Sequence, residues 1–289
     1  MIGIVLAGGT GSRLWPITLG VSKQLIPIYD KPLVHYPIGT LMMSGIKEIV
    51  IITTEEDQIG FKKLLGDGSM YGVKFHYKTQ VKPEGIAQAF IIAEELIKGK
   101  KVCLILGDNL FHGTGLGRQL KRFKDIDGAQ IFAYQVADPE RYGVVNIDYS
   151  GKVVSIEEKP MLPKSKFAVP GLYFYDENVI EIAKNIRPSL RGELEISSVN
   201  QEYLERGNLK VEILPRGTAW LDTGTISSLY DAASLVKTLE ERQGTKISCL
   251  EEIAFRNGWI TLNDLKHLIE KYNDNSYSRY LRIITEESI

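Results

Sequence analysis

The sequence has little cysteine and almost no net charge, and both absences narrow the classes of protein it can encode. Only two cysteines occur among 289 residues, Cys103 and Cys249, and neither belongs to a Cys-x-x-Cys pair. This excludes a disulfide framework and favours a reducing compartment. Lysine and arginine total 35 against 36 aspartate and glutamate residues, a formal net charge of −1. Because such a balance gives no overall attraction to nucleic acid or anionic membranes, we expect small-molecule partners and no nucleic acid.

Long apolar runs are also absent. No uninterrupted apolar stretch approaches the ~20 residues that a membrane-spanning helix needs, and no basic segment with an apolar core opens the sequence. We therefore expect a cytoplasmic protein that contacts no membrane. Its 44% hydrophobic and 25% charged residues are typical of a globular domain.

Several catalytic patterns are missing. The four histidines show no His-x-x-x-His or Cys/His spacing, which argues against a zinc site, and no Gly-x-Ser-x-Gly nucleophile elbow occurs. The P-loop pattern is absent too. A dinucleotide-binding fingerprint starting at Gly9 fails because Leu14 stands where the third glycine is needed.

Short apolar runs alternate with amphipathic stretches in the first half of the chain. We expect strands at 2–6, 49–52, 73–77, 102–106 and 131–134, and a helix over 86–97. This alternation predicts an α/β fold with a mostly parallel sheet flanked by helices. Beyond about Ala137, shorter strands at 144–147, 153–157 and 172–175 predict a substrate lobe. A long helix follows from Ile226 to about Gln243, and the remaining tail is predicted to be a small helical extension.

The first strand leads into a glycine-rich loop, LAGGTGSRLWP. Glycines let a ligand approach backbone N–H groups, while Ser12 adds a hydroxyl and Arg13 a permanent positive charge. The loop therefore suits an anion such as phosphate. Taken alone, it is equally consistent with a flexible turn that carries an exposed arginine.

Two aspartates follow strand-like runs. Asp108 comes after 102–106, and Asp222 comes after 219–221. Ligands of open α/β sheets bind beyond the carboxyl ends of strands, and Mg²⁺ typically takes one or two carboxylates together with substrate phosphates. Each aspartate could instead cap a helix.

Glu158 and Lys159 end another predicted strand. Strand alternation places them on opposite faces unless Pro160 bends the chain. Their plainest interpretation is a surface ion pair, whereas the functional one gives Lys159 a phosphate and Glu158 sugar hydroxyls to bind. Together with the glycine loop and the aspartates, they favour phosphoryl or nucleotidyl transfer.

The order of several motifs resembles one family over nearly the whole chain. The matching stretches are 6–16, 23–32, 64–68, 85–89, 107–109, 139–145, 157–160, 192–196 and 220–225. They are similar to those of sugar-nucleotide pyrophosphorylases. Several motifs in one order are far more specific than the glycine loop alone, so they favour the anion site over the flexible turn.

This resemblance implies a fold and a reaction. The fold is a Rossmann-like core with a sugar-binding lobe. The reaction converts dTTP and α-D-glucose 1-phosphate to dTDP-glucose and pyrophosphate with Mg²⁺, a step toward dTDP-L-rhamnose and related deoxysugars. Residues 1–243 are expected to form the nucleotidyltransferase domain, with a nucleotide half at about 1–136 and a sugar-binding half at about 137–243. Residues 244–289 are the C-terminal helical extension.

The resemblance also implies roles for individual residues. The nucleotide-binding residues are Gly8, Gly9, Thr10, Gly11, Ser12, Arg13, Gln24, Gln80, Pro83 and Gly85. The sugar-binding residues are Tyr142, Gly143, Glu158, Lys159, Val169 and Tyr173. The catalytic residues are Arg13, Lys23, Asp108, Lys159 and Asp222, of which Asp108 and Asp222 bind Mg²⁺.

Two alternatives remain at this point. A uridylyltransferase that uses UTP is one, because the Gln24 amide suits uracil as well as thymine. A non-catalytic sugar-nucleotide sensor is the other, although a sensor need not keep Arg13, Lys159 and both aspartates. The family resemblance further implies a homotetramer that dTDP-rhamnose inhibits, with the tail from Gly244 contributing to a regulatory nucleotide site.

Overall fold

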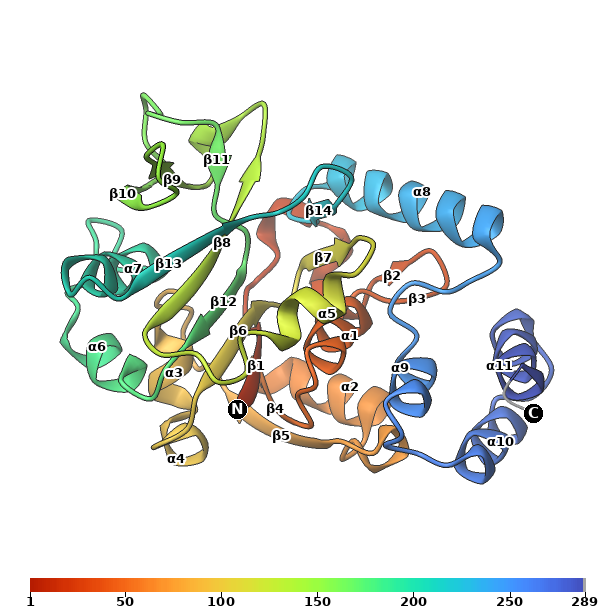
Figure 1. Cartoon of the computed structure of the whole chain (residues 1–289). Helices are drawn as coiled ribbons and strands as arrows, with labels where there is room; N and C mark the ends of the chain where they lie inside the picture. The colour runs from red at the N-terminus through yellow and green to blue at the C-terminus, as the bar shows by residue number, and fades with distance from the viewer. Residues whose placement is uncertain (288–289) are drawn as a thin grey trace.

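The centre of the molecule is a parallel sheet built from the most apolar runs of the sequence. The computed structural model describes residues 1–287. Four parallel strands lie in the order β6 (Val102–Leu106), β1 (Ile2–Ala7), β4 (Glu48–Thr53) and β5 (Lys74–Thr79). Because helices cover both faces, β1, β4 and β6 carry apolar side chains in both directions. Figure 1 shows these strands between the helices.

Antiparallel strands extend the same sheet beyond β6. The β12 strand (Leu172–Tyr175) pairs antiparallel with β6 and with β8 (Ala129–Gln135). Further strands are β9 (Gly143–Ile147), β10 (Val153–Glu158), β11 (Phe167–Ala168) and β13 (Leu209–Ile213). The sheet has ten strands and runs through both the expected nucleotide half and the expected sugar half. The predicted fold class, a mixed Rossmann-like sheet flanked by helices, is confirmed.

The helices of the described residues are α1 (His35–Met43), α2 (Glu55–Leu65), α3 (Gln88–Ile92), α4 (Glu94–Ile97), α5 (Leu116–Lys121), α6 (Val179–Asn185), α7 (Ile196–Glu205), α8 (Ile226–Gln243), α9 (Leu250–Arg256), α10 (Leu262–Lys271) and α11 (Ser276–Glu286). Several of them cover the two faces of the sheet, whereas α8, α10 and α11 pack mainly on other elements. One core joins alternate β1 residues such as Val5 to α1, α2 and α9, and the other joins Ile4 to α3, α6 and α7. The helix expected over 86–97 is two short helices that meet at Ala93, where the backbone has φ −90° and ψ 0°.

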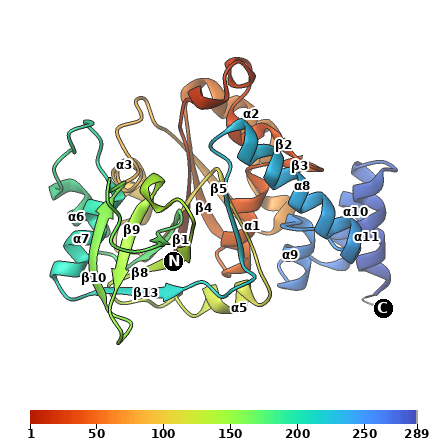
Figure 2. The same ribbon diagram turned by 90° about the horizontal axis from the view of Figure 1, so that it is seen from above.

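The predicted C-terminal helical extension is present as α9, α10 and α11. Figure 2 shows it at one end of the molecule, beside α8 and away from β8–β10. Ion pairs connect the start of the extension to the rest of the protein. Lys246 pairs with Asp30 and with Glu240 (3.1 Å), and Lys31 pairs with the same two carboxylates. Among residues 1–287, no helix is long and apolar enough to cross a membrane.

Candidate active site

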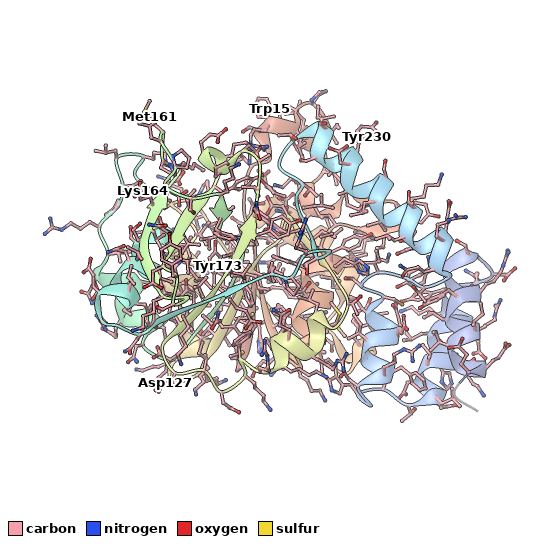
Figure 3. The ribbon with its side chains drawn as sticks, turned by 45° about the horizontal axis from the view of Figure 1, so that its top comes forward. Trp15, Asp127, Met161, Lys164, Tyr173 and Tyr230 are labelled. Carbon is pink, nitrogen blue, oxygen red and sulfur yellow. The ribbon has the colours of Figure 1, made fainter. Side chains whose placement is uncertain are left out.

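The glycine-rich loop leaves β1 at the carboxyl edge of the sheet. Gly8 packs against Gln80 so closely that a Cβ at Gly8 would lie 2.2 Å from the Gln80 side-chain oxygen. Gly11 has φ 62°, which favours glycine, and starts a short 3₁₀ turn over Ser12–Leu14. Figure 3 shows Trp15, at the end of this turn, projecting at the surface, whereas Tyr173 lies inside the molecule.

A two-stranded sheet brings the two aspartates together. Asp108 lies between β6 and β7 (Asn109–His112), and β7 pairs antiparallel with β14 (Ala219–Asp222), so that Asn109 is opposite Asp222. The Thr223 N–H and hydroxyl both donate to the Asp108 carbonyl, at 3.2 and 2.9 Å. Neither aspartate caps a helix, because a strand follows Asp108 and Thr225 caps α8.

The two carboxylates differ in their charge environment. Burial opposes ionisation of Asp108, but the Lys23 ammonium that hydrogen-bonds to it outweighs burial and holds its pKa below the ordinary value. Burial raises the pKa of Asp222, and the Asp108 charge raises it further. The positive charge of Arg13 opposes this rise in the pKa of Asp222. Arg13 and Asp222 lie near each other beside Gly224, where an added Cβ would be about 3 Å from both the guanidinium and the carboxylate. Two carboxylates that repel each other favour a bound cation.

The residues fit a divalent metal that is only partly coordinated by protein. Within residues 1–287, no group of three or more His, Cys, Asp or Glu side chains could enclose a metal ion. Asp108 and Asp222 would supply two carboxylates to such a metal and leave its other positions open. This is the donor set that Mg²⁺ takes when water and substrate phosphates complete its shell.

Two cavities share Asp108 of this aspartate pair. The first cavity has a volume of about 240 Å³ and is lined by residues including Tyr173, Trp220 and Asp222. The second cavity has a volume of about 250 Å³ and is lined by residues including Gln24 and Gln80. Both are lined by Asp108, Glu158 and Lys159, as well as by Ile86 and Leu106. The shared residues show that the two cavities are neighbours at Asp108.

The expected site residues divide between these cavities. The first is lined by all the residues expected to bind sugar, namely Tyr142, Gly143, Glu158, Lys159, Val169 and Tyr173, together with Arg13. The second is lined by Gly9, Lys23, Gln24, Gln80, Pro83 and Gly85. Four expected nucleotide residues, Gly8, Thr10, Gly11 and Ser12, line neither cavity. Gly8 lies behind Gln80, and the other three form the outer part of the loop.

Glu158 and Lys159 lie on the same cavity wall, although strand alternation would separate them. The β10 strand ends at Glu158, and Lys159 before Pro160 has φ 42°, outside the strand conformation. The bend brings the Lys159 ammonium to 3.8 Å from the Glu158 carboxylate. Burial raises the pKa of Glu158, while Lys159 opposes the rise.

Sequence reasoning gave no role to the segment before α7. Arg191 in this segment pairs with Glu195 at 2.8 Å and Glu193 at 3.4 Å, and its guanidinium is 3.7 Å from Glu158. These three segment residues line the second cavity. The stretch 192–196 is one of the motifs that match the family, but the match alone did not assign a contact to any of its residues.

Other lining residues were given no role by the sequence analysis, although two of them lie in matching motifs. Asn109, Ser197, Asn200 and Trp220 line the first cavity from three different elements. Each is an ordinary polar or aromatic residue within a strand or helix pattern. Only the three-dimensional arrangement brings them to one wall.

Comparisons with known proteins agree with this geometry. A model of the nucleotidyl transferase family matches residues 2–238. Glucose-1-phosphate thymidylyltransferase from Mycobacterium tuberculosis H37Rv is 55% identical over 288 residues, covering 100% of both chains. The enzyme of the same name from Neisseria meningitidis is 55% identical over 97% of this chain and 98% of its own.

Solved structures show the same fold. A chain from Bacillus anthracis, assigned as a glucose-1-phosphate thymidylyltransferase, aligns with a TM-score of 0.75 and 41% identity over 81% of this chain and 95% of its own. A UDP-glucose pyrophosphorylase aligns with a TM-score of 0.72 and 23% identity over 82% of this chain and 98% of its own, which is a likeness of fold. The site therefore belongs to an enzyme that transfers nucleotidyl groups, and the chain is a member of the nucleotidyl transferase family.

Proposed function

We propose that this nucleotidyltransferase converts dTTP and α-D-glucose 1-phosphate to dTDP-glucose and pyrophosphate. The observation that carries the proposal is the junction of the two cavities at Asp108, Glu158 and Lys159. A nucleotide in the second cavity and a sugar phosphate in the first would bring their phosphates together beside the aspartate pair. Relatives of that name at 55% identity support the choice of substrates.

The cations around the junction suit the charge problem of this reaction. An oxygen of the sugar phosphate attacks the α-phosphorus of the nucleotide in line, and pyrophosphate leaves. Both reactants are anionic, so the reaction needs positive charge more than it needs a base, since the attacking oxygen is already ionised. Arg13 and Lys23 are assigned to the triphosphate and its leaving group, and Lys159 to the sugar phosphate.

Asp108 and Asp222 would hold Mg²⁺, our choice of metal for a family that generally depends on one. When bound, Mg²⁺ neutralises phosphate charge that the lysine and arginine side chains leave uncompensated. Lys23, which pairs with Asp108 here, can then turn its ammonium toward the phosphates.

The second cavity offers amide groups for a base edge. The Gln80 amide N–H donates to Gln88 at 2.6 Å, and the Gln88 amide in turn donates to Glu84 at 2.8 Å, which restricts rotation of Gln80. Gly85, at φ 107°, lies so close to the Leu194 backbone that a Cβ would be 2.4 Å from its carbonyl oxygen. We assign Gln24, Gln80, Pro83 and Gly85 to the base and deoxyribose, and the backbone of Gly8–Ser12 to the phosphates.

The first cavity suits a hydroxyl-rich ligand. Glu158 can accept hydrogen bonds from sugar hydroxyls beside the aromatic side chains of Tyr142 and Tyr173, while the Gly143 backbone and Val169 complete the wall. We assign residues 1–136 to the nucleotide half and 137–243 to the sugar half of one domain on this basis.

A competition assay tests the proposed reaction. Purified protein is mixed with glucose 1-phosphate, Mg²⁺ and equal dTTP and UTP, and both pyrophosphate release and product identity are followed. We expect dTDP-glucose to predominate. Predominant UDP-glucose would favour the uridylyltransferase alternative, and tight binding of dTTP without pyrophosphate release would favour a sensor.

A third cavity supports the regulatory nucleotide site that the sequence analysis expects. It has a volume of about 400 Å³ and is lined both by the core, with Arg118 and Lys121, and by the extension, with Ser248 and Arg256. The buried Ser248 hydroxyl has no hydrogen-bond partner in residues 1–287. We assign this cavity to feedback inhibition by dTDP-rhamnose in a cytoplasmic homotetramer. Unchanged turnover at saturating dTDP-rhamnose would reject this assignment and leave the catalytic one intact.

A further inference from the structure

Asn109 is a buried polar residue that lines the first cavity and makes three polar contacts through its side chain. The residue is 2% exposed. The amide nitrogen donates to Asp108 Oδ1 at 2.9 Å. The amide oxygen accepts from the Trp220 indole N–H at 2.6 Å and from the Gly171 backbone N–H at 3.1 Å.

These partners leave only one orientation for the amide. An indole N–H and a backbone N–H can donate but cannot accept, so both require the oxygen of Asn109. A flipped amide would place its own N–H groups against two donors in a buried site and leave all of them unpaired. The nitrogen must therefore face Asp108. Because Lys23 contacts Asp108 Oδ2, the two oxygens of this carboxylate have different fixed partners.

The same contacts reach the wall of the first cavity. Trp220 lines that cavity, and its ring packs on Tyr142 at 5.1 Å and Tyr134 at 5.5 Å between centroids. Gly171 also lines the cavity and approaches Asn109 so closely that a Cβ would be 2.9 Å from the amide oxygen. A displacement of the Trp220 indole therefore changes the contact that orients Asp108.

We propose that Asn109 is a positioning residue that fixes the Asp108 carboxylate for metal binding and links its orientation to the Trp220 wall of the first cavity. The inference rests on the proposed assignment of the metal to Asp108 and Asp222. Groups that orient metal ligands without touching the metal typically contribute about 10- to 100-fold in metal affinity or activity.

The test measures binding of Mn²⁺ alone to the full-length protein, by the loss of the electron paramagnetic resonance signal of free Mn²⁺. The variants are Asn109→Leu, which keeps a similar volume but has no amide, Trp220→Phe, which keeps a ring but has no indole N–H, and the double variant. Asp222→Asn identifies the part of the binding that belongs to the aspartate pair. Thermal melting and kcat are measured on the same preparations.

We expect Asn109→Leu to weaken Mn²⁺ binding about 10-fold and Trp220→Phe to weaken it about threefold, although Trp220 touches neither aspartate. The double variant should bind no more weakly than Asn109→Leu, because both changes act on one contact. If Asn109→Leu does not fold, weaker Mn²⁺ binding by folded Trp220→Phe still supports the inference.

Unchanged Mn²⁺ affinity in the folded variants would overturn it, as would independent effects that multiply in the double variant. A lowered melting temperature with wild-type affinity would mean that Asn109 only stabilises the fold. If the Asp222→Asn variant binds Mn²⁺ as tightly as the wild type, the proposed assignment of the metal to the aspartate pair is itself wrong. The two failures are therefore distinguishable.

Discussion

The two cavities share a wall that carries both signs of charge, but they differ in the rest of their lining. The second cavity, beside the parallel strands, adds Lys23 and the amide side chains of Gln24 and Gln80. The first cavity, beside the antiparallel strands, adds the aromatic side chains of Tyr142 and Trp220. Parallel strands end together at one edge, where loops can surround an anion, whereas antiparallel strands present their side chains across a face. Under the proposed assignment of the substrates, the comparison teaches that one sheet can serve phosphate and hydroxyl recognition by changing strand direction.

The largest effect is expected where the two regions meet. Asp222→Asn should lower kcat about 10³-fold, because it removes one of two proposed metal ligands. The folded protein should be at least as stable, since burial and Asp108 raise the pKa of Asp222 and disfavour its charged form. Steady-state kinetics and thermal melting check both parts. A change below fivefold in kcat would remove Asp222 from the metal site.

Arg13→Ala tests the proposed contact of the glycine-rich loop with phosphate. Arg13 is exposed, so we expect an unchanged melting temperature, with kcat lowered about 10²-fold because charge on the leaving pyrophosphate loses a partner. Arg13→Lys serves as the matched control and should recover part of the rate. Wild-type turnover in a folded Arg13→Ala protein would contradict the assignment.

Glu158→Gln tests the hydroxyl-binding region. The KM for glucose 1-phosphate should rise about 10-fold, because a charged acceptor becomes a neutral one, while the KM for dTTP changes little. Because Glu158 lines both cavities, equal changes in both KM values would mean that it affects both substrates and is not specific to the sugar hydroxyls.

The same variant has a pH-dependent effect on stability. Burial raises the pKa of Glu158 in the folded protein, so wild-type folding loses stability as the pH rises from its unfolded pKa through its folded pKa. Glu158→Gln lacks this loss. Its free energy of unfolding relative to wild type should therefore increase over that pH interval and then level off, as urea denaturation at several pH values can measure.

The smallest effect is expected outside both regions. Thr261 caps α10 in the extension, where its hydroxyl accepts from the Asp264 N–H at 3.2 Å. Thr261→Ala should lower the free energy of unfolding by about 1 kcal/mol and leave kcat and both KM values unchanged. Altered kinetics would show that the extension influences the cavities directly.

The site residues beside the parallel strands could be predicted because each of them directly follows a strand in the sequence. The glycine loop comes after β1 and Asp108 comes after β6, so the strand-end rule placed both at one edge. Lys159 was harder, since the bend before Pro160 overrides strand alternation. Arg191 and Trp220 could not be placed from local patterns, because their positions depend on contacts with Glu195 and Asn109 rather than on periodicity.

The pairing of β7 with β14 also sets when the protein can become active during synthesis. Thr223 holds the carbonyl of Asp108 across 115 residues of sequence. A growing chain that has completed β1, β4 and β6 already has the sheet centre and the glycine loop, yet it has only one of the two aspartates. The aspartate pair, our proposed metal site, forms only after more than three quarters of the chain has been synthesised, so under that proposal incomplete chains cannot consume nucleotide through it.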